Sequence, residues 1–200
     1  MSELGIIILA AGESKRMGFP KLKLELDGKS LLDYVLDITS SLKEVETVLV
    51  LGAYMKLYNN IAGKWPVNKV FNKEWQSGMG VSIVTGLRFL LDKSETAINS
   101  VMILLADQPF VTKAYLEKMI LKSNTTNKGI IISDYGSVSG PPVIFKSPYF
   151  DNLLELKGDQ GAKHLIAHHQ NDCEAMSFPE GKYDVNTPED HNRLIRRKSR

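Results

Sequence analysis

The chain has 200 residues, of which 43% are hydrophobic and 24% are charged, and this length and composition are typical of a globular protein with a sizeable core. The formal net charge is only +2, so the sequence supplies no strong field of either sign. The single cysteine, Cys173, excludes an internal disulfide and favours a reducing compartment, so we expect a cytoplasmic protein.

The apolar run Leu4–Ala11 is far shorter than the ~20 residues that span a bilayer. Glu3 precedes it, where a signal peptide has basic residues, so we expect no membrane partner. A basic run near the C-terminus reads either as a nucleic-acid contact or as the solvated end of a helix. We favour the helix end and expect no nucleic-acid partner. The run consists of Arg193, Arg196, Arg197, Lys198 and Arg200.

Short apolar runs alternate with amphipathic stretches along the chain, which is the pattern of βα units in a mostly parallel sheet. The runs are unbroken and rich in β-branched residues, as in strands that helices cover on both faces. We predict strands over Leu4–Leu9, Val45–Leu51, Val67–Phe71, Val101–Leu105 and Gly129–Ser133. The glycine- and proline-rich segment 135–145 enters a further short strand, and it reads equally as a substrate-side loop or as a plain connection.

Helices are predicted between these runs, after Ser30, Gly52, Met79 and Thr112. Ser30 and Asp33 have the spacing of a capping box. A last helix is predicted at Thr187, because a threonine is followed there by a proline and two acids. The sequence shows no linker, repeat or low-complexity tract, so we predict one α/β domain over residues 1–200.

The stretch Leu9–Lys21 leaves the first predicted strand at its carboxyl end, where open α/β sheets bind ligands. The small residues 10–12 would let backbone N–H groups approach a phosphate. Arg16 and Lys21 add cationic side chains that can neutralise phosphate oxygens. The alternative is a solvated basic loop.

The glycine spacing of this stretch excludes two common phosphate loops. Five residues lie between Gly12 and Gly18, and Phe19 follows, which fits neither a Walker A loop nor a dinucleotide fingerprint. No helix is predicted to open at this point, because Lys21–Leu26 alternates like a strand before an Asp27-Gly28 turn.

The loop Leu9-Ala-Ala-Gly-Glu-Ser-Lys-Arg-Met-Gly-Phe-Pro-Lys21 resembles the signature loop of the nucleotidyltransferase superfamily. Within that superfamily the chain is similar to the MobA-like NTP transferases, and among these to the molybdenum cofactor cytidylyltransferases. The resemblance extends almost end to end and implies a three-layer αβα fold with a Rossmann-like, mostly parallel sheet, of the nucleotide-diphospho-sugar transferase type. The other segments that carry it are Trp75–Ser82, Leu104–Pro109, Gly140–Val143, Gly158–Ala162 and Asp184–Asp190.

The implied reaction is attack by an acceptor phosphate on the α-phosphorus of an NTP, with release of pyrophosphate. Its barrier arises mainly from the meeting of anionic oxygens, so positioning and charge neutralisation should dominate. The resemblance places the triphosphate on the first loop beside Arg16, with Lys21 near the α-phosphate, and it makes Arg16, Lys21 and Asp107 the catalytic set. The implied nucleotide-binding residues are Leu9, Ala10, Ala11, Gly12, Arg16, Lys21, Gly78 and Ser82.

Base recognition is expected near Gly78, Met79 and Ser82, since glycine backbone can reach a base edge and a hydroxyl can donate or accept. Trp75 could stack on a base, but a core position is the favoured interpretation. Ala11 and Gln108 resemble the cytidylyl branch of the family, so CTP is favoured over GTP.

Mg²⁺ is the predicted cofactor, and this cation takes oxygen ligands of which the protein usually supplies one or two. Asp107 follows a predicted strand at its carboxyl end and is the leading ligand, although it could simply cap a turn. The resemblance adds Asp184 or Asn186 as a second ligand; Asn186 stands where relatives often have aspartate, and it could instead serve the helix start.

The resemblance places the phosphorylated acceptor at Gly140, Pro142 and Asp159. Asp159 is predicted to begin a helix whose N–H groups could hold the acceptor phosphate, and plain capping is the alternative. His164 and His168 have a metal-binding i, i+4 spacing, but no carboxylate completes the set, so we favour ordinary histidines.

The predicted activity is transfer of CMP from CTP to the phosphate of molybdenum cofactor (molybdopterin), which a client molybdoenzyme would then receive. One alternative is a nucleotidyltransferase that acts on a sugar phosphate or another small phosphorylated acceptor. The other is a non-catalytic carrier of the cofactor, which would bind cofactor without releasing pyrophosphate. The presence of Arg16, Lys21 and Asp107 together argues against the carrier.

Overall fold

The structure, a computed structural model, describes residues 4–94, 97–183, 185, 187, 189 and 190. Its main sheet has seven described strands in the order β5-β4-β1-β6-β8-β7-β9. The strands are β1 (Leu4–Ala10), β4 (Val45–Leu51), β5 (Asn68–Phe71), β6 (Ser100–Leu105), β7 (Ile130–Asp134), β8 (Ser139–Lys146) and β9 (Cys173–Ser177). A separate two-stranded hairpin is formed by β2 (Glu25–Leu26) and β3 (Lys29–Ser30).

The sheet is mostly parallel. Strands β5, β4, β1 and β6 pair in parallel, and β7 pairs in parallel with β9. Only β8, among the described strands of this sheet, runs against its neighbours, pairing antiparallel with both β6 and β7. The carboxyl ends of the parallel strands therefore share one edge of the sheet, and the loops after β1 and β6 lie next to each other there.

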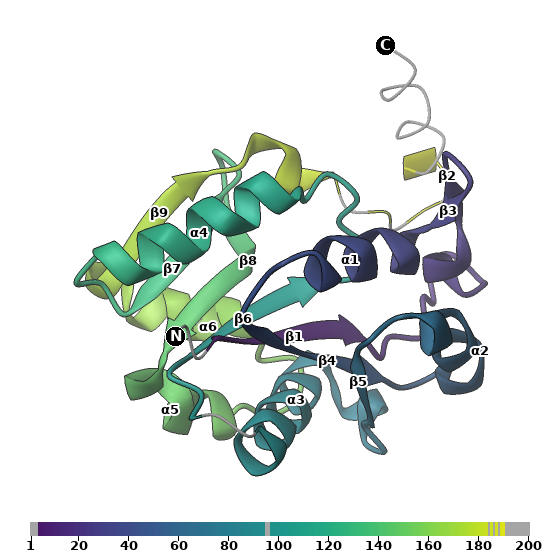
Figure 1. Cartoon of the computed structure of the whole chain (residues 1–200), viewed down its shortest axis with the longest axis horizontal. Helices are drawn as coiled ribbons and strands as arrows, with labels where there is room; N and C mark the ends of the chain where they lie inside the picture. The colour runs from purple at the N-terminus through teal and green to yellow at the C-terminus, as the bar shows by residue number, and fades with distance from the viewer. Residues whose placement is uncertain (1–3, 95–96, 184, 186, 188, 191–200) are drawn as a thin grey trace.

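Helices cover both faces of this sheet (Figure 1). One face carries α1 (Leu31–Ser40), α2 (Met55–Ile61) and α4 (Lys113–Thr125). The other carries α3 (Met79–Lys93), α5 (Phe150–Leu154) and α6 (Ala162–His168). Short 3₁₀ turns complete the description: η1 (Lys21–Lys23), η2 (Ala62–Lys64), η3 (Trp75–Ser77), η4 (Ser147–Tyr149), η5 (Gln170–Asp172) and η6 (Pro179–Lys182).

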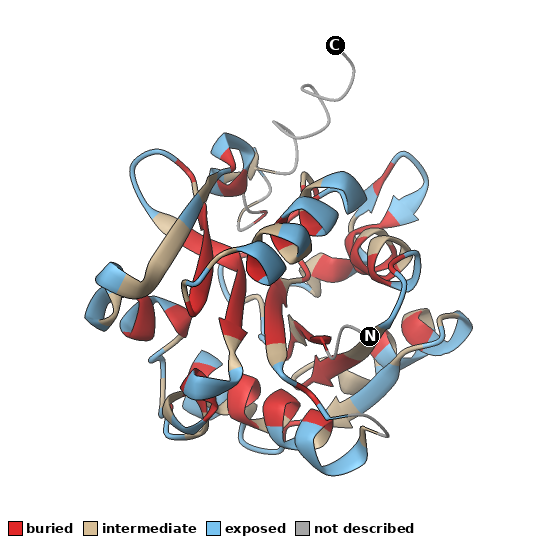
Figure 2. Cartoon of the chain, turned by 60° about the vertical axis from the view of Figure 1, so that its left-hand side comes forward, coloured by how far each residue is buried: buried red, intermediate tan, exposed pale blue. Residues whose placement is uncertain are grey.

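The core consists of two apolar layers that share the sheet, and buried positions concentrate along the central strands and the inner helix faces (Figure 2). In β1, Ile6 and Ile8 face the α1 side while Ile7 faces the α3 side, because successive side chains of a strand point to opposite faces. All three are fully buried. The predicted three-layer αβα fold is confirmed, and so are the five predicted strands to within a residue or so.

The predicted helix starts are largely confirmed. The hydroxyl of Ser30 accepts a hydrogen bond from Asp33 N at the start of α1, and Thr112 caps α4 through Tyr115 N. Thr187 and Asp190 exchange the two hydrogen bonds of a capping box. The basic run from Arg193 onward lies outside the described residues.

Three local predictions are wrong. Lys21–Leu26 is a strand only at its last two residues, because hydrogen bonds from Lys23 N to Pro20 O and from Leu24 N to Lys21 O close a 3₁₀ turn first. The segment before Phe145 is an eight-residue central strand, β8, instead of a short one. Asp159 does not begin a helix: Gly158 adopts a positive φ of 56°, and α6 starts after Gly161.

Candidate active site

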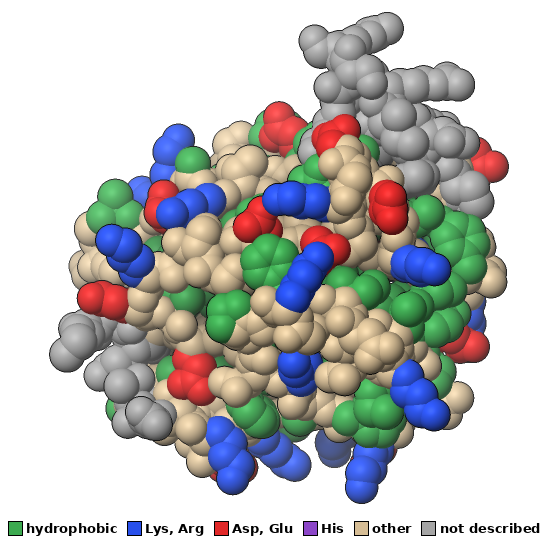
Figure 3. Space-filling view, turned by 45° about the vertical axis from the view of Figure 1, so that its right-hand side comes forward, with side chains coloured by type: hydrophobic (Ala, Val, Ile, Leu, Met, Phe, Trp, Pro, Cys, Tyr) green, Lys and Arg blue, Asp and Glu red, His purple; other side chains and the backbone are tan. Residues whose placement is uncertain are grey.

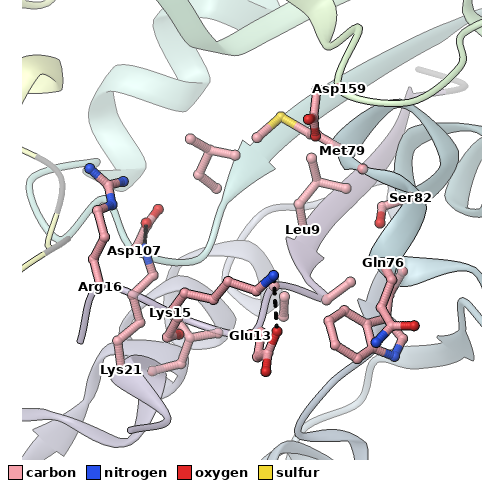
Figure 4. A pocket seen from close by; sticks show the side chains of 18 residues that line it. Leu9, Glu13, Lys15, Arg16, Lys21, Gln76, Met79, Ser82, Asp107 and Asp159 are labelled. Carbon is pink, nitrogen blue, oxygen red and sulfur yellow. Dashed lines mark hydrogen bonds and ion pairs between the residues drawn. The ribbon is translucent and has the colours of Figure 1, made fainter. Parts of the chain in front are cut away.

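A cavity of about 600 Å³ opens at the carboxyl edge of the parallel strands. The loop after β1 forms one wall, and η3 with the first turns of α3 forms the opposite wall. Figure 4 shows Arg16 and Asp107 at one end of the cavity, with Gln76 and Ser82 at the other. The cavity therefore has two chemically different ends on either side of the end of β1.

The loop after β1 is folded into tight turns that leave its backbone open to the cavity. Ser14 O accepts hydrogen bonds from Met17 N at 2.9 Å and from Gly18 N at 3.2 Å. Behind the loop, Gly52 allows close contact with Ala11, since a Cβ at Gly52 would overlap the Ala11 backbone. A Cβ at Gly12, in contrast, would meet nothing within 4 Å. The space beside Gly12 is thus available to a ligand.

At one end of the cavity, Lys21 Nζ forms an ion pair and hydrogen bond with Asp107 Oδ2. The two side chains are only 17% and 13% exposed, so water screens this pair less than a surface pair. Arg16, by comparison, is exposed and lies beside Asp107 in Figure 4. This end combines positive charge for an anion with a carboxylate suited to a cation.

The turn that carries Asp107 is held firmly in place. Asp107 O accepts a hydrogen bond from Val185 N at 3.3 Å. The next side chain, Gln108, is buried and donates from Nε2 to Tyr135 Oη at 3.1 Å and to Gly181 O at 3.3 Å. The segment before the last helix therefore lies directly against the turn after β6.

At the other end, glycines allow the start of α3 to pack against the loop before α6. Gly78 has a φ of 118°, and a Cβ there would overlap the backbone of Gly158. Gly80 N donates to Gly158 O at 2.9 Å. These contacts bring Asp159 to the rim of the cavity. Gly78 was expected to help reach a base edge, and its packing against Gly158 is an additional reason for a glycine at this position.

The structure brings most of the predicted site residues together around this cavity. Those that line it are Leu9, Ala10, Ala11, Gly12, Arg16, Lys21, Gly78, Ser82, Asp107 and Asp159. Two predicted acceptor residues, Gly140 and Pro142, are buried in β8 and are not among the lining residues. Asp184 and Asn186 lie outside the described residues.

Several lining residues were not predicted from the sequence. Glu13, Ser14 and Lys15 belong to the first loop, and their position within the signature stretch was a sufficient signal. Gln76 lies in the segment Trp75–Ser82, which also carries the resemblance, so it had a comparable signal. Trp75 is half-buried: it contacts the core on one side and lines the cavity on the other, so the core interpretation was only partly correct.

The donor set is suited to a hard divalent cation. Asp107 offers a largely buried carboxylate at the cavity wall, and Mg²⁺ typically takes one or two carboxylates while keeping water and phosphate oxygens as further ligands. Across the part of the chain that the structure describes, no cluster of three or more His, Cys, Asp or Glu side chains could hold a metal by itself. His164 and His168 lie ring to ring at 4.4 Å on α6.

The surface around the site carries mixed charge. On the face shown in Figure 3, lysine and arginine side chains are interspersed with carboxylates, without one dominant basic patch. Among residues 4–94, 97–183, 185, 187, 189 and 190, no helix combines the length and the apolar character needed to cross a bilayer.

Fold and sequence together define the class of this protein. Residues 6–173 match the family described as "MobA-like NTP transferase domain", and the chain belongs to that family. It is therefore an NTP-dependent nucleotidyltransferase. Such transferases typically use a divalent metal ion, and the carboxylate of Asp107 is suited to hold one.

Individual relatives are similar to this chain over different shares of their own length. The chain is 29% identical to "Purine catabolism protein PucB" of Bacillus subtilis strain 168 over 203 residues, which covers 96% of this chain and 95% of the relative. It is 25% identical to "Bifunctional protein GlmU" of Buchnera aphidicola subsp. Schizaphis graminum over 146 residues, and there it spans only 30% of the relative.

Solved structures share the fold. Rv0371c of Mycobacterium tuberculosis H37Rv superposes with a TM-score of 0.79 at 23% identity, over 98% of both chains, and that protein has also been solved in complex with manganese. Molybdopterin-guanine dinucleotide biosynthesis protein A of Archaeoglobus fulgidus superposes with a TM-score of 0.72 at 19% identity, again over 98% of both chains.

Proposed function

We propose that this chain transfers CMP from CTP to the phosphate of a molybdopterin cofactor, with Mg²⁺ as the metal. The observation that carries the proposal is the two-ended cavity. One end holds Arg16, Lys21 and Asp107, and the other holds Gln76 and Ser82. Gly78 also lines the cavity. A nucleotide has the same division, with charged phosphates at one end and a planar base with hydrogen-bonding edges at the other.

In this proposal the triphosphate lies along the loop after β1. The backbone beside Gly12 leaves room for a phosphate, and Arg16 supplies a planar guanidinium cation that can donate two hydrogen bonds to it. Lys21 lies deeper and offers a compact, mobile positive charge toward the α-phosphate. Together these groups bind and orient the anion before any bond changes.

The chemical step forms one bond and breaks another. An oxygen of the acceptor phosphate forms a bond to the α-phosphorus, and the bond to the oxygen that bridges the α- and β-phosphorus breaks. Pyrophosphate leaves with that electron pair. Lys21 neutralises charge that accumulates around the α-phosphate. When bound, Mg²⁺ would be held by Asp107, with Asp184 or Asn186 as the second proposed ligand, and would neutralise and orient phosphate oxygens.

CTP and molybdopterin are proposed on family likeness. Ala11 and Gln108 are the residues that favour the cytidylyl branch over GTP. The acceptor would enter from the side of Asp159, at the rim of the cavity. Gly140 and Pro142 are buried in β8. They remain proposed acceptor residues only in the sense that they would position residues next to them in the chain. A client molybdoenzyme is the proposed recipient of the product.

The test is pyrophosphate release from each of the four NTPs with Mg²⁺, with and without molybdopterin cofactor. We expect release with CTP that depends on the cofactor. Cofactor-dependent release with GTP instead would contradict the base assignment alone. Release that needs a sugar phosphate or another phosphorylated acceptor would contradict the acceptor assignment and leave the reaction class in place.

A further inference from the structure

The wall of the cavity that carries Ser82 is fixed by a buried side chain from another element. Asn72 follows β5 and is 3% exposed, and its Nδ2 donates a hydrogen bond to Ser82 Oγ at 3.0 Å. Ser82 belongs to α3, is 4% exposed, and lines the cavity. A polar pair thus links the end of an edge strand to the proposed base end of the site.

The backbone determines which way the Asn72 carboxamide faces. Glu74 N, which can only donate, forms a hydrogen bond of 2.9 Å to Asn72 Oδ1. The carboxamide oxygen is therefore committed to Glu74, and the NH₂ group faces Ser82. Since an NH₂ group only donates, Ser82 Oγ must accept this hydrogen bond.

Ser82 consequently keeps its own hydrogen for another partner. A serine hydroxyl has one hydrogen to donate and two lone pairs to accept with. Among the described residues, the bond from Asn72 is the one hydrogen bond found at Ser82 Oγ. Thr85, one turn further along α3, behaves differently and donates to Val81 O at 2.8 Å. Its hydroxyl is used within the helix, whereas that of Ser82 faces a ligand cavity.

We propose that Asn72 is a positioning residue that holds the Ser82 hydroxyl as a hydrogen-bond donor to an acceptor atom of the nucleobase. This inference rests on the proposed function, because it assumes that the base occupies this end of the cavity. Figure 4 shows Ser82 beside Gln76 and Leu9, on the opposite side from Arg16 and Asp107. The complementary ligand atom is a ring nitrogen or ring carbonyl oxygen.

The decisive variant is Asn72→Asp. Aspartate has the shape of asparagine but no NH₂ group, so it would accept from both Glu74 N–H and Ser82 O–H. The Ser82 hydrogen would then turn away from the cavity and leave a lone pair facing the acceptor atom of the base. We expect CTP to bind about tenfold more weakly, the effect of about one lost hydrogen bond.

Two ligands separate this effect from a change of charge or fold. Calorimetric titrations with CTP and with inorganic tripolyphosphate, both with Mg²⁺, compare a ligand that has a base with one that has phosphates alone. Asn72→Asp should weaken CTP and leave tripolyphosphate unchanged. An equal loss for both ligands would mean general repulsion or misfolding, and it would overturn the inference.

Further variants keep the test open if Asn72→Asp does not fold. Ser82→Ala should weaken CTP about tenfold without affecting tripolyphosphate, and Thr85→Val, the matched control on the same helix, should affect neither ligand. Asn72→Ala adds no charge and frees the hydroxyl to rotate, so we expect a smaller selective loss of CTP affinity. Full CTP affinity in Ser82→Ala or in Asn72→Ala would overturn the proposal.

The outcomes also distinguish this inference from the proposed function. If the wild-type protein binds CTP no better than tripolyphosphate, the base does not contribute and the proposed function is contradicted. If it prefers CTP and Asn72→Asp retains that preference, only the role of Asn72 is contradicted. In the double variant Asn72→Asp/Ser82→Ala, we expect CTP affinity no lower than in Ser82→Ala, because the Asn72 effect passes through the hydroxyl.

Discussion

The ion pair between Lys21 and Asp107 joins two side chains whose proposed roles exclude their pairing. Lys21 is proposed to bind phosphate, and Asp107 is proposed to bind the metal, yet each is the other's partner in this structure. Neutralising Asp107 should therefore remove the ion pair with which a phosphate would have to compete for Lys21. A substitution in the pair can therefore test whether this ion pair opposes nucleotide binding when no metal is present.

In metal-free buffer with EDTA, we expect Asp107→Asn to bind CTP about tenfold more tightly than wild type, a change of roughly 1.4 kcal/mol. The substitution removes a negative charge from the cavity, and with it the ion pair that competes with the phosphates for Lys21. Titration calorimetry measures the difference. Glu13→Gln is the control, because its exposed pair with Lys15 at 3.6 Å is screened by water and should contribute less. Unchanged or weaker binding in Asp107→Asn would contradict this account.

Gly12 provides a separate test of the phosphate loop. A Cβ at this position meets nothing within 4 Å, so Gly12→Ala should leave the free energy of unfolding within about 0.5 kcal/mol of wild type. The added methyl group should nevertheless obstruct a phosphate and weaken CTP about tenfold. Gly63→Ala, equally unobstructed but away from the cavity, is the control. If both variants bind CTP like wild type, the triphosphate does not lie against Gly12.

Secondary-structure elements of this protein are predictable from sequence wherever their signals are local. Buried β-branched runs gave the strands, and Ser30 and Thr112 gave helix starts. The reversed direction of β8 was not predictable, because it depends on which strands its residues pair with. The same holds for the start of α6 at Ala162, which follows from the packing of the preceding loop against α3.

The candidate site shows the same division. The signature loop, Gly78, Ser82 and Asp107 could be found from motifs, since each lies in a recognisable stretch. Asn72 could not, because it lies outside these stretches and its role depends on the position of α3 relative to the edge strand. Long-range contacts of this kind are invisible to spacing arguments.

Helix α1 is joined to the neighbouring η2 turn by one buried carboxylate, and this connection should depend on pH. Asp33 accepts hydrogen bonds from Trp65 Nε1 and Lys64 Nζ, both at 2.9 Å, and from Ser30 Oγ at 2.8 Å. Burial raises the pKa of Asp33, but these hydrogen bonds outweigh it and lower the pKa below the ordinary value of 3.8.

Because the folded pKa is lowered, Asp33 contributes stability above the unfolded pKa and loses it as pH falls through the folded value. We expect Asp33→Asn to lower the free energy of unfolding by about 2 kcal/mol at pH 7. The difference from wild type should shrink below about pH 4. Urea denaturation at both pH values measures it. A difference that stays constant would show that the charge on Asp33 does not matter.

Considered as a whole, the molecule has two apolar layers on opposite faces of one sheet. If the helices on one face unfolded, the apolar face of the sheet beneath them would be exposed to water, and the sheet would also lose its support for the layer on the other face. We therefore predict that residues 1–200 unfold as a single cooperative domain. In scanning calorimetry, the van't Hoff and calorimetric enthalpies should agree, whereas two resolved transitions would indicate separable domains.

We propose that this cavity transfers the nucleotidyl group and releases pyrophosphate. Radioactive phosphorus can be followed from CTP labelled at either the α- or the γ-position, with Mg²⁺ and molybdopterin cofactor. We expect the α-label to move to the acceptor while the γ-label leaves in pyrophosphate, and we expect Lys21→Ala to abolish both without unfolding the protein. Transfer of the γ-label to the acceptor would contradict nucleotidyl transfer, and full transfer by Lys21→Ala would contradict the role of Lys21.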